Sequence, residues 1–281
     1  MRGLDLTVGT GEVFGFLGPN GAGKTTTIRI LLDVLRPTSG EASVLGLDSR
    51  RSGVEARRRI GYLPGDLALY PKLTARETLT YLAALRGGVA EAAVTALADR
   101  LELELDRPVG TLSHGNRQKV GLVQAFMHDP ELLVLDEPTA GLDPLLQQEF
   151  QRLVLEAAAA GRTVFLSSHA LSEVERVAGR VGIIRAGTLV ALEEIATLKA
   201  RATRRLDVEL SQAAERDAFA RLPGVREAEV DGRHLRLVVE GSVDAVVKAL
   251  AAHEVVSITS HEPDLEEVFL DYYRPEPPDA A

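Results

Sequence analysis

The segment GPNGAGKT, at residues 18–25, contains residue types that can hold a phosphate group. It matches the pattern G-x-x-x-x-G-K-[ST], in which glycines let successive backbone N–H groups turn toward an anion. A helix is expected to begin at this loop, and its free N–H groups and dipole favour negative charge. The sequence therefore predicts a nucleotide site in which Lys24 neutralises the β- and γ-phosphates and Thr25 ligates Mg²⁺. The residues predicted to bind the nucleotide are Gly18, Pro19, Asn20, Gly21, Ala22, Gly23, Lys24, Thr25 and Thr26.

Two adjacent carboxylates follow the apolar run LLVL, as Asp136 and Glu137. A strand that ends this way places them at the carboxyl edge of a parallel sheet, beside the phosphate loop. We expect Asp136 to hold Mg²⁺ through water and Glu137 to polarise the attacking water. A solvated strand end is the alternative, and the nearby phosphate loop disfavours it.

His169 directly follows a further apolar run, TVFLSS at residues 163–168. Ligands gather at the carboxyl ends of strands in open α/β sheets. A hydrogen bond from this ring to the γ-phosphate is therefore a candidate role. From position alone, a surface histidine without a ligand stays open as the alternative.

The segment LSHGNRQ, at residues 112–118, indicates a second anion site. Ser113 is a good N-cap for a helix through Val120, Val123 and Met127. The start of that helix, with Gly115, can bind an anion. One chain has no obvious use for two such sites, and a capped helix without a ligand is the alternative.

The order of elements predicts an α/β fold followed by a smaller α+β unit. Residues 1–200 are expected to form the first domain, with a helical insert at about residues 75–130 that opens on a capping box of Thr74 and Glu77. The composition shifts near residue 200, and residues 201–274 are expected to form the second domain. Strands are expected at 13–17, 132–135, 163–166, 181–184, 188–190, 206–210, 225–230, 234–240 and 255–259, helices at 243–250 and 265–273, and a disordered tail at 275–281.

Bulk composition excludes several classes of function. The 281 residues carry a formal net charge of −9 and contain no cysteine. The charge disfavours nucleic acid as a partner, and disulfides, thiolate metal sites and cysteine nucleophiles are excluded. The sequence lacks a run of roughly 18 apolar residues, so any membrane role is expected to depend on a partner protein.

Taken together, these motifs resemble the ATP-binding cassette of ABC transporters, over about residues 3–195. The order matches, with Walker A at 18–25, the signature at 112–118, Walker B at 132–137, the D-loop at 139–143 and the H-loop at His169. The resemblance implies a P-loop NTPase fold, ATP and Mg²⁺ as ligands, and an ATPase. It also implies that His169 contacts the γ-phosphate. The catalytic residues would be Glu137, His169 and Lys24, and the metal ligands Thr25 and Asp136.

The same resemblance implies that two cassettes, most simply a homodimer, close on two ATP molecules. The signature of one copy would contact the ATP held by the other, through Ser113, His114, Gly115 and Asn116. A separate membrane permease would dock near residues 62–79, with the chain at the cytoplasmic face of the membrane. The end of the chain, with EPDLEEVF at residues 262–269, resembles the C-terminal domain of bacterial drug and antibiotic exporter ATPases. The prediction is an exporter ATPase, and the alternative is a soluble or weakly active ABC ATPase that is not coupled to transport.

Three features depart from the family pattern. The signature usually reads LSGGQ, and here His114 and Asn116 replace a glycine and the glutamine. Gly65 stands where the Q-loop glutamine is expected, and Asp66 is a candidate substitute. Residues 1–4 are expected to begin inside the first β-region, as if the first strand were truncated. Either the start codon is misassigned or adenine lacks its aromatic stacking partner.

Overall fold

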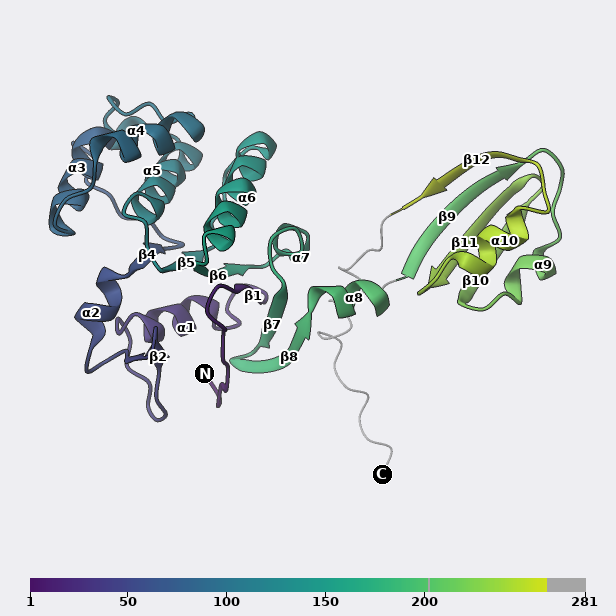
Figure 1. The fold of residues 1–281 in the computed structure, drawn as a ribbon, viewed down its shortest axis with the longest axis horizontal. Helices are drawn as coiled ribbons and strands as arrows, with labels where there is room; N and C mark the ends of the chain where they lie inside the picture. Colours follow the sequence, from purple (N-terminus) through teal and green to yellow (C-terminus); the bar gives the residue numbers. More distant parts are fainter. Residues whose placement is uncertain (202, 262–281) are drawn as a thin grey trace. The chain divides into compact units, whose positions relative to one another are not determined.

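The computed structural model describes residues 1–201 and 203–261. The chain divides into two compact units, Met1–Leu192 and Glu193–Ala281 (Figure 1). The division comes eight residues before the predicted boundary at residue 200, because helix α8 (Ile195–Arg201) groups with the second unit.

Unit 1 is built on a six-stranded sheet with the order β4-β5-β6-β1-β7-β8. Three central strands, β1 (Val13–Leu17), β5 (Leu132–Asp136) and β6 (Thr163–Ser168), are parallel to one another and buried throughout. Their continuous apolar runs suit strands that are covered on both faces. The register aligns Leu17 with Ser168 and Asp136 with Ser167, so the carboxyl ends of all three strands meet at one edge. The sheet is completed by β4 (Ile60–Leu63), β7 (Arg180–Arg185) and β8 (Thr188–Glu194). A separate two-stranded sheet pairs β2 (Ser43–Val44) with β3 (Leu47–Asp48).

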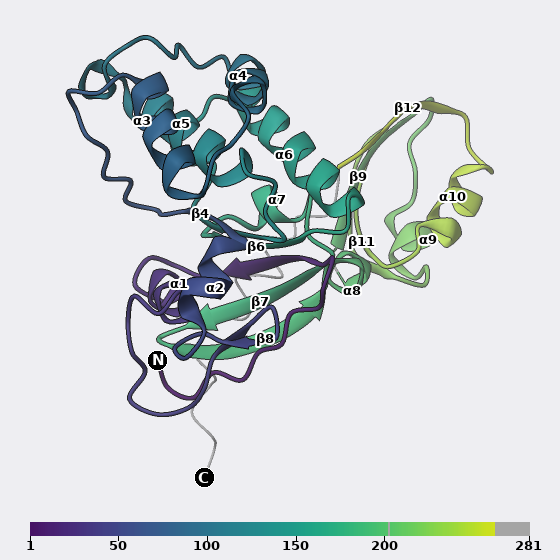
Figure 2. The same ribbon diagram turned by 60° about the vertical axis from the view of Figure 1, so that its left-hand side comes forward.

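Helices of unit 1 form two groups. Helices α3 (Ala75–Leu85), α4 (Glu91–Arg100) and α5 (His114–Phe126) gather together and correspond to the predicted helical insert (Figure 2). The predicted capping box at the start of α3 is confirmed, with the Thr74 side chain and the Glu77 carboxylate each bonded to the other residue's backbone N–H. The remaining helices are α1 (Lys24–Leu31), α2 (Gly53–Arg58), α6 (Pro144–Ala159) and α7 (Leu171–Val174).

Two predictions about strands need correction. Strands β2, β3 and β4 were not among the expected strands, and β4 contains Gly61. A glycine is required there, since a Cβ would stand 2.0 Å from the carbonyl oxygen of Ala125. Residues 1–4 were expected inside a β-region, but they form no strand. Gly3 adopts φ 62, which interrupts an extended conformation.

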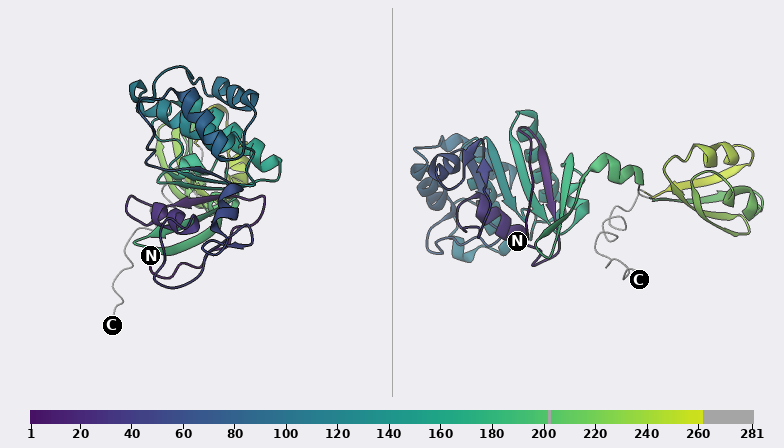
Figure 3. Two further views of the ribbon diagram at one scale, coloured as in Figure 1. Left: turned by 90° about the vertical axis from the view of Figure 1, so that its left-hand side faces the viewer. Right: turned by 90° about the horizontal axis from the view of Figure 1, so that it is seen from below.

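Unit 2 contains an antiparallel sheet with the order β10-β11-β9-β12. From β9 to β12 the chain order is βαββαβ, the ferredoxin-like arrangement. Both helices lie on the same face of the sheet (Figure 3), where Phe219, Val246 and Leu250 pack on Leu206 and Leu237. The elements are β9 (Thr203–Leu210), α9 (Arg216–Ala220), β10 (Val225–Asp231), β11 (His234–Glu240), α10 (Asp244–Leu250) and β12 (Val255–Ser260). The predicted helix at 265–273 and tail at 275–281 lie outside the described residues.

Candidate active site

The phosphate loop connects the buried strand β1 to helix α1. Gly21 and Gly23 adopt φ 79 and φ 115, conformations in which a side chain would be strained. Gly18 is required for space, because a Cβ would lie 2.6 Å from the carbonyl oxygen of Ile184. Helix α1 begins without a side-chain cap, so its first N–H groups stay available to an anion.

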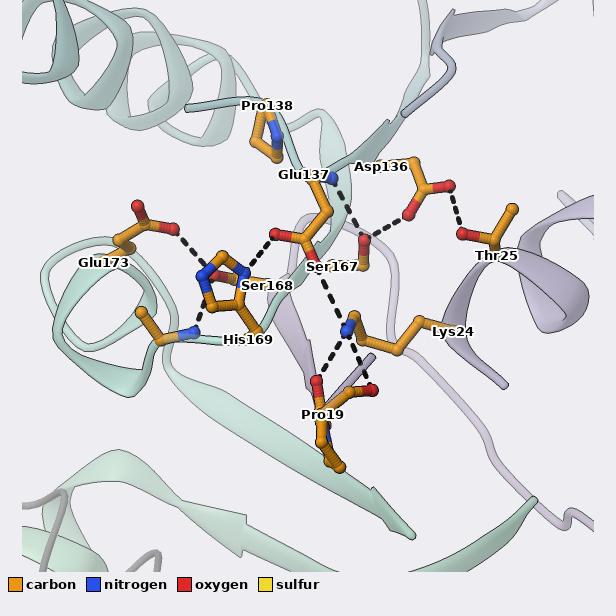
Figure 4. A network of polar contacts seen from close by, with 12 residues as sticks. Pro19, Lys24, Thr25, Asp136, Glu137, Pro138, Ser167, Ser168, His169 and Glu173 are labelled. Atoms are coloured by element: carbon orange, nitrogen blue, oxygen red, sulfur yellow. Dashed lines mark hydrogen bonds and ion pairs between the residues drawn. The ribbon is translucent and has the colours of Figure 1, made fainter. Parts of the chain in front are cut away.

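The Lys24 side chain folds back into this loop and is 6% exposed. Its Nζ donates to the carbonyl oxygens of Gly18, at 2.5 Å, and Pro19, at 3.4 Å. It also lies 3.1 Å from Oε1 of Glu137, as an ion pair (Figure 4). The ammonium therefore joins the phosphate loop to the carboxylate at the end of β5.

Asp136 is fully buried and accepts two hydroxyl hydrogen bonds. Thr25 Oγ1 donates to its Oδ2 at 2.7 Å, and Ser167 Oγ donates to its Oδ1 at 2.5 Å. A hydroxyl next to a carboxylate is a set of oxygen donors that suits Mg²⁺, which keeps several waters and takes phosphate oxygens as further ligands. The described residues contain no cluster of three or more acidic or histidine side chains that could hold a metal ion by themselves.

Glu137 is held from three directions. Its backbone adopts φ 50, which is uncommon for a residue with a side chain. Its N–H lies 3.1 Å from Ser167 Oγ and 3.2 Å from the Ser167 carbonyl oxygen, and its own carbonyl accepts from Gln118 Nε2 at 3.2 Å. The carboxylate contacts Lys24 through Oε1 and His169 Nδ1 through Oε2, the latter at 2.8 Å (Figure 4). The His169 side chain is 60% exposed, so its remaining edge is open to a ligand.

The signature residues begin helix α5. Ser113 is its N-cap, as predicted, and its Oγ accepts from the Asn116 N–H at 3.2 Å. Ser113 and His114 are exposed, while Gly115 and Asn116 are half-buried. Among the described residues, no hydrogen bond joins these four residues to the loop at 18–25. The structure thus brings together the Walker A, Walker B and H-loop residues but not the signature.

Gly65 faces the Asp136 carboxylate, because a Cβ at this position would lie 3.3 Å from Asp136 Oδ2. Asp66 lines a cleft of about 270 Å³ together with Leu69, His114 and Arg117. Residue 65 therefore lies beside the predicted metal site, but as a glycine it has no side chain that could bind the metal. The substitution of Asp66 for the missing glutamine stays a prediction.

Two further residues of the site were not found from the sequence, namely Ser167 and Gln118. Ser167 could have been found only from the register of β5 with β6, which places it beside Asp136. Gln118 lies 19 residues from Glu137, and no local pattern reveals their contact.

Comparison with known proteins agrees with this geometry. Residues 1–140 match the family model described as ABC transporter. The bacitracin transport ATP-binding protein BcrA of Bacillus licheniformis is 43% identical over 213 residues, which cover 74% of this chain and 69% of BcrA. The chain belongs to the ABC transporter family. A fluoroquinolones export ATP-binding protein of Mycobacterium tuberculosis is 34% identical over 278 residues, covering 96% of this chain and 86% of the relative.

The structure of an ATP-binding subunit of an ABC transporter superposes on this ABC subunit with a TM-score of 0.62. It is 32% identical and covers 68% of this chain and 81% of its own length. These comparisons confirm the predicted cassette fold, the family and the ATPase class. They give no support to the alternative of an ATPase that is not coupled to transport. Among the described residues, no helix has the length and apolar character needed to span a membrane.

Proposed function

We propose that this ABC subunit powers the export of a small molecule, of the drug or antibiotic class, through a separate membrane permease. It would work as a homodimer at the cytoplasmic face of the membrane. The relatives named for bacitracin transport and fluoroquinolones export support the substrate class, and the second of them matches nearly the whole chain. The observation that carries the proposal is the convergence of Lys24, Asp136, Glu137 and His169 at the carboxyl ends of β1, β5 and β6.

Nucleotide binding uses the backbone amides of the loop and the ammonium of Lys24. The ammonium already lies inside the loop, against two carbonyl oxygens. Phosphate oxygens are stronger acceptors for a cation than carbonyls, because they are charged. Lys24 therefore exchanges its carbonyl contacts for the β- and γ-phosphates when ATP binds.

Thr25 and Asp136 are the residues that would hold Mg²⁺, as their adjoining oxygens suggest. When bound, Mg²⁺ supplies positive charge that neutralises the phosphates during transfer. Ser167 fixes the second oxygen of the Asp136 carboxylate, so its orientation does not depend on the ion. Gly65 adjoins this carboxylate and has no side chain that could add a ligand to the metal.

Glu137 is proposed to orient the attacking water, since its carboxylate stands beside the Lys24 ammonium. His169 is proposed to contact the γ-phosphate through Nε2. A neutral imidazole that donates from Nδ1 to Glu137 cannot also donate from Nε2. Donation to phosphate from a neutral ring therefore requires His169 to release Glu137, and this release frees the carboxylate to bind water.

The signature residues are proposed to contact the nucleotide of a second copy. These residues form the exposed N-terminus of helix α5, where the Ser113 hydroxyl and the free helix N–H groups favour an anion. The pocket becomes complete only when two copies close, and this closure would be transmitted to the permease. Residues 62–79 are the proposed docking face, where the Tyr70 side chain is exposed and meets Tyr81 edge to face.

The test uses the purified full-length chain. We expect Mg²⁺-dependent ATP hydrolysis and ATP-induced dimers in wild type. Lys24→Ala should reduce hydrolysis at least a hundredfold, because one fixed cation at the phosphates is lost. The matched control is Lys248→Ala, which removes an exposed lysine of unit 2. Equal hydrolysis by wild type and Lys24→Ala would refute the proposal.

The permease contact has its own experiment. The wild-type chain should co-purify with a membrane protein of the permease class when the two are expressed together. Changing Leu69 and Tyr70 to Ala should abolish this association while ATP binding stays normal. Unchanged association would exclude residues 62–79 as the docking face.

A further inference from the structure

Gln118, on the first turns of helix α5, is 3% exposed. Its Nε2 donates to two consecutive carbonyl oxygens, those of Glu137 and Pro138, each at 3.2 Å. A buried side-chain NH₂ group that donates to two carbonyls has both of its donors satisfied and is held in one orientation. The contact therefore ties helix α5 to the segment that follows strand β5.

The bond from Gln118 is made to Glu137, a residue with an unfavourable backbone conformation. Glu137 adopts φ 50, a conformation that a residue with a side chain keeps only when its surroundings hold it. Ser167 of strand β6 accepts from its N–H, and its carbonyl accepts from the Ala140 N–H within the segment and from Gln118 of helix α5. Both peptide groups of Glu137 are thus anchored, and the direction of the carboxylate depends on both anchors.

The start of α5 has a second contact with the same segment. A Cβ at Gly115 would stand 2.3 Å from the carbonyl oxygen of Gly141, and a Cβ at Gly141 would stand 2.6 Å from the His114 ring. The helix start and residues 137–141 are therefore packed without space for a side chain between them. A displacement of the signature residues must displace this segment with them.

We infer that Gln118 is a positioning residue that couples the signature of one copy to the catalytic carboxylate of the same copy. The inference rests on the proposed dimer. In that dimer, the signature contacts the nucleotide of the partner, whereas Glu137 faces the nucleotide of its own chain. Nucleotide binding at one site thereby sets the position of Glu137 at the other, and this linkage makes hydrolysis cooperative in ATP.

The test replaces Gln118 with Met, which keeps the length of the side chain and removes the amide. Wild type should show a Hill coefficient above 1 for ATP hydrolysis. Gln118→Met should lower kcat about tenfold with an unchanged KM, because a small displacement of a catalytic group is costly. Its Hill coefficient should fall to about 1, because nucleotide binding at one site no longer affects hydrolysis at the other.

A matched control is Gln124→Met, a half-buried position six residues further along the same helix. It should retain the wild-type kcat and Hill coefficient. Wild-type kcat and cooperativity in Gln118→Met would refute the coupling alone. A wild-type chain that stays monomeric with ATP would refute the dimer and the coupling together, so the two failures are distinguishable.

Gln118→Glu gives an independent readout if the Met variant does not fold. An ionised carboxylate cannot donate to the two carbonyls, whereas a protonated one donates once. The activity of Gln118→Glu relative to wild type should therefore rise as the pH falls from 8 to 6. A flat ratio over this range, with ATP binding intact, would contradict the role of the donated hydrogen bond.

Discussion

The two sheets of this chain place their charged residues in opposite ways. In unit 1, charged side chains stand at the ends of buried parallel strands, with Lys24 6% exposed and Asp136 fully buried. In unit 2, they spread over the helix-free face of an antiparallel sheet, where Arg236 is 60% exposed and its partners Asp207 and Glu229 are 42% and 70% exposed. The first arrangement concentrates charge at one point, and the second distributes it in water.

This difference distinguishes charged residues that serve catalysis from charged residues that only face solvent. Burying a charge is costly unless it is paired and hydrogen-bonded, so a cluster such as Lys24, Asp136 and Glu137 is kept only where it has a task. Exposed ion pairs cost little and contribute little. We therefore expect substitutions of charged residues to have large effects at the strand ends of unit 1 and small effects on the open face of unit 2.

The largest expected effect comes from Asp136→Asn. The amide keeps the shape of the carboxylate but removes the negative charge, and its NH₂ group meets a hydroxyl of Thr25 or Ser167. We expect kcat for ATP hydrolysis to fall at least a hundredfold, as for the loss of one preorganised charge at a phosphoryl-transfer site. Steady-state phosphate release from the full-length chain measures this. Asp207→Asn, in unit 2, is the matched substitution and should leave kcat within twofold of wild type.

The sequence predicted those parts of the site and the fold that depend on neighbouring residues. The phosphate loop and the Asp136–Glu137 pair were predicted because their chemistry lies in consecutive residues. Strand β11 was predicted with its bounds, because the Asp231-Gly232 turn separates it from the strand before it.

The undetected residues depend on contacts that are distant in the chain. Ser167 bonds Asp136 across 31 positions, and Gln118 bonds Glu137 across 19. Which polar side chains meet is decided by strand register and helix packing, and composition does not contain this information. Strand β4 was missed for a related reason, because Gly61 is required by the Ala125 carbonyl of helix α5, a neighbour that only the fold supplies.

An intermediate effect is expected for His128, a half-buried ionisable group of unit 1. Burial lowers its pKa to about 4, and the nearby charge of Arg86 acts in the same direction. Above pH 6.5 the ring is neutral in both states. As the pH falls toward 4, the unfolded chain binds a proton that the folded chain does not, so stability is lost across this window. We expect the chain to be about 1 kcal/mol less stable at pH 5 than at pH 7 from this group, allowing for solvent screening.

The urea-induced unfolding transition of unit 1, recorded at pH 7 and at pH 5, measures this effect. His128→Gln should show a smaller loss of stability between the two pH values than wild type. His234→Gln, at an exposed position of unit 2, is the control and should behave as wild type does. An equal pH dependence in His128→Gln would mean that other groups carry the acid sensitivity of unit 1.

The smallest expected effect is that of Arg236→Ala, on the open face of unit 2. Arg236 makes two ion pairs, with Asp207 and Glu229, each at 3.2 Å. Because all three side chains are exposed, their pairing should contribute no more than about 1 kcal/mol to stability, and 0.5 M salt should reduce that contribution further. Urea unfolding at two salt concentrations, together with ATPase kinetics, measures both properties. A loss of hydrolysis in Arg236→Ala would show that the open face of unit 2 acts on the active site, and the contrast between the two sheets would then fail.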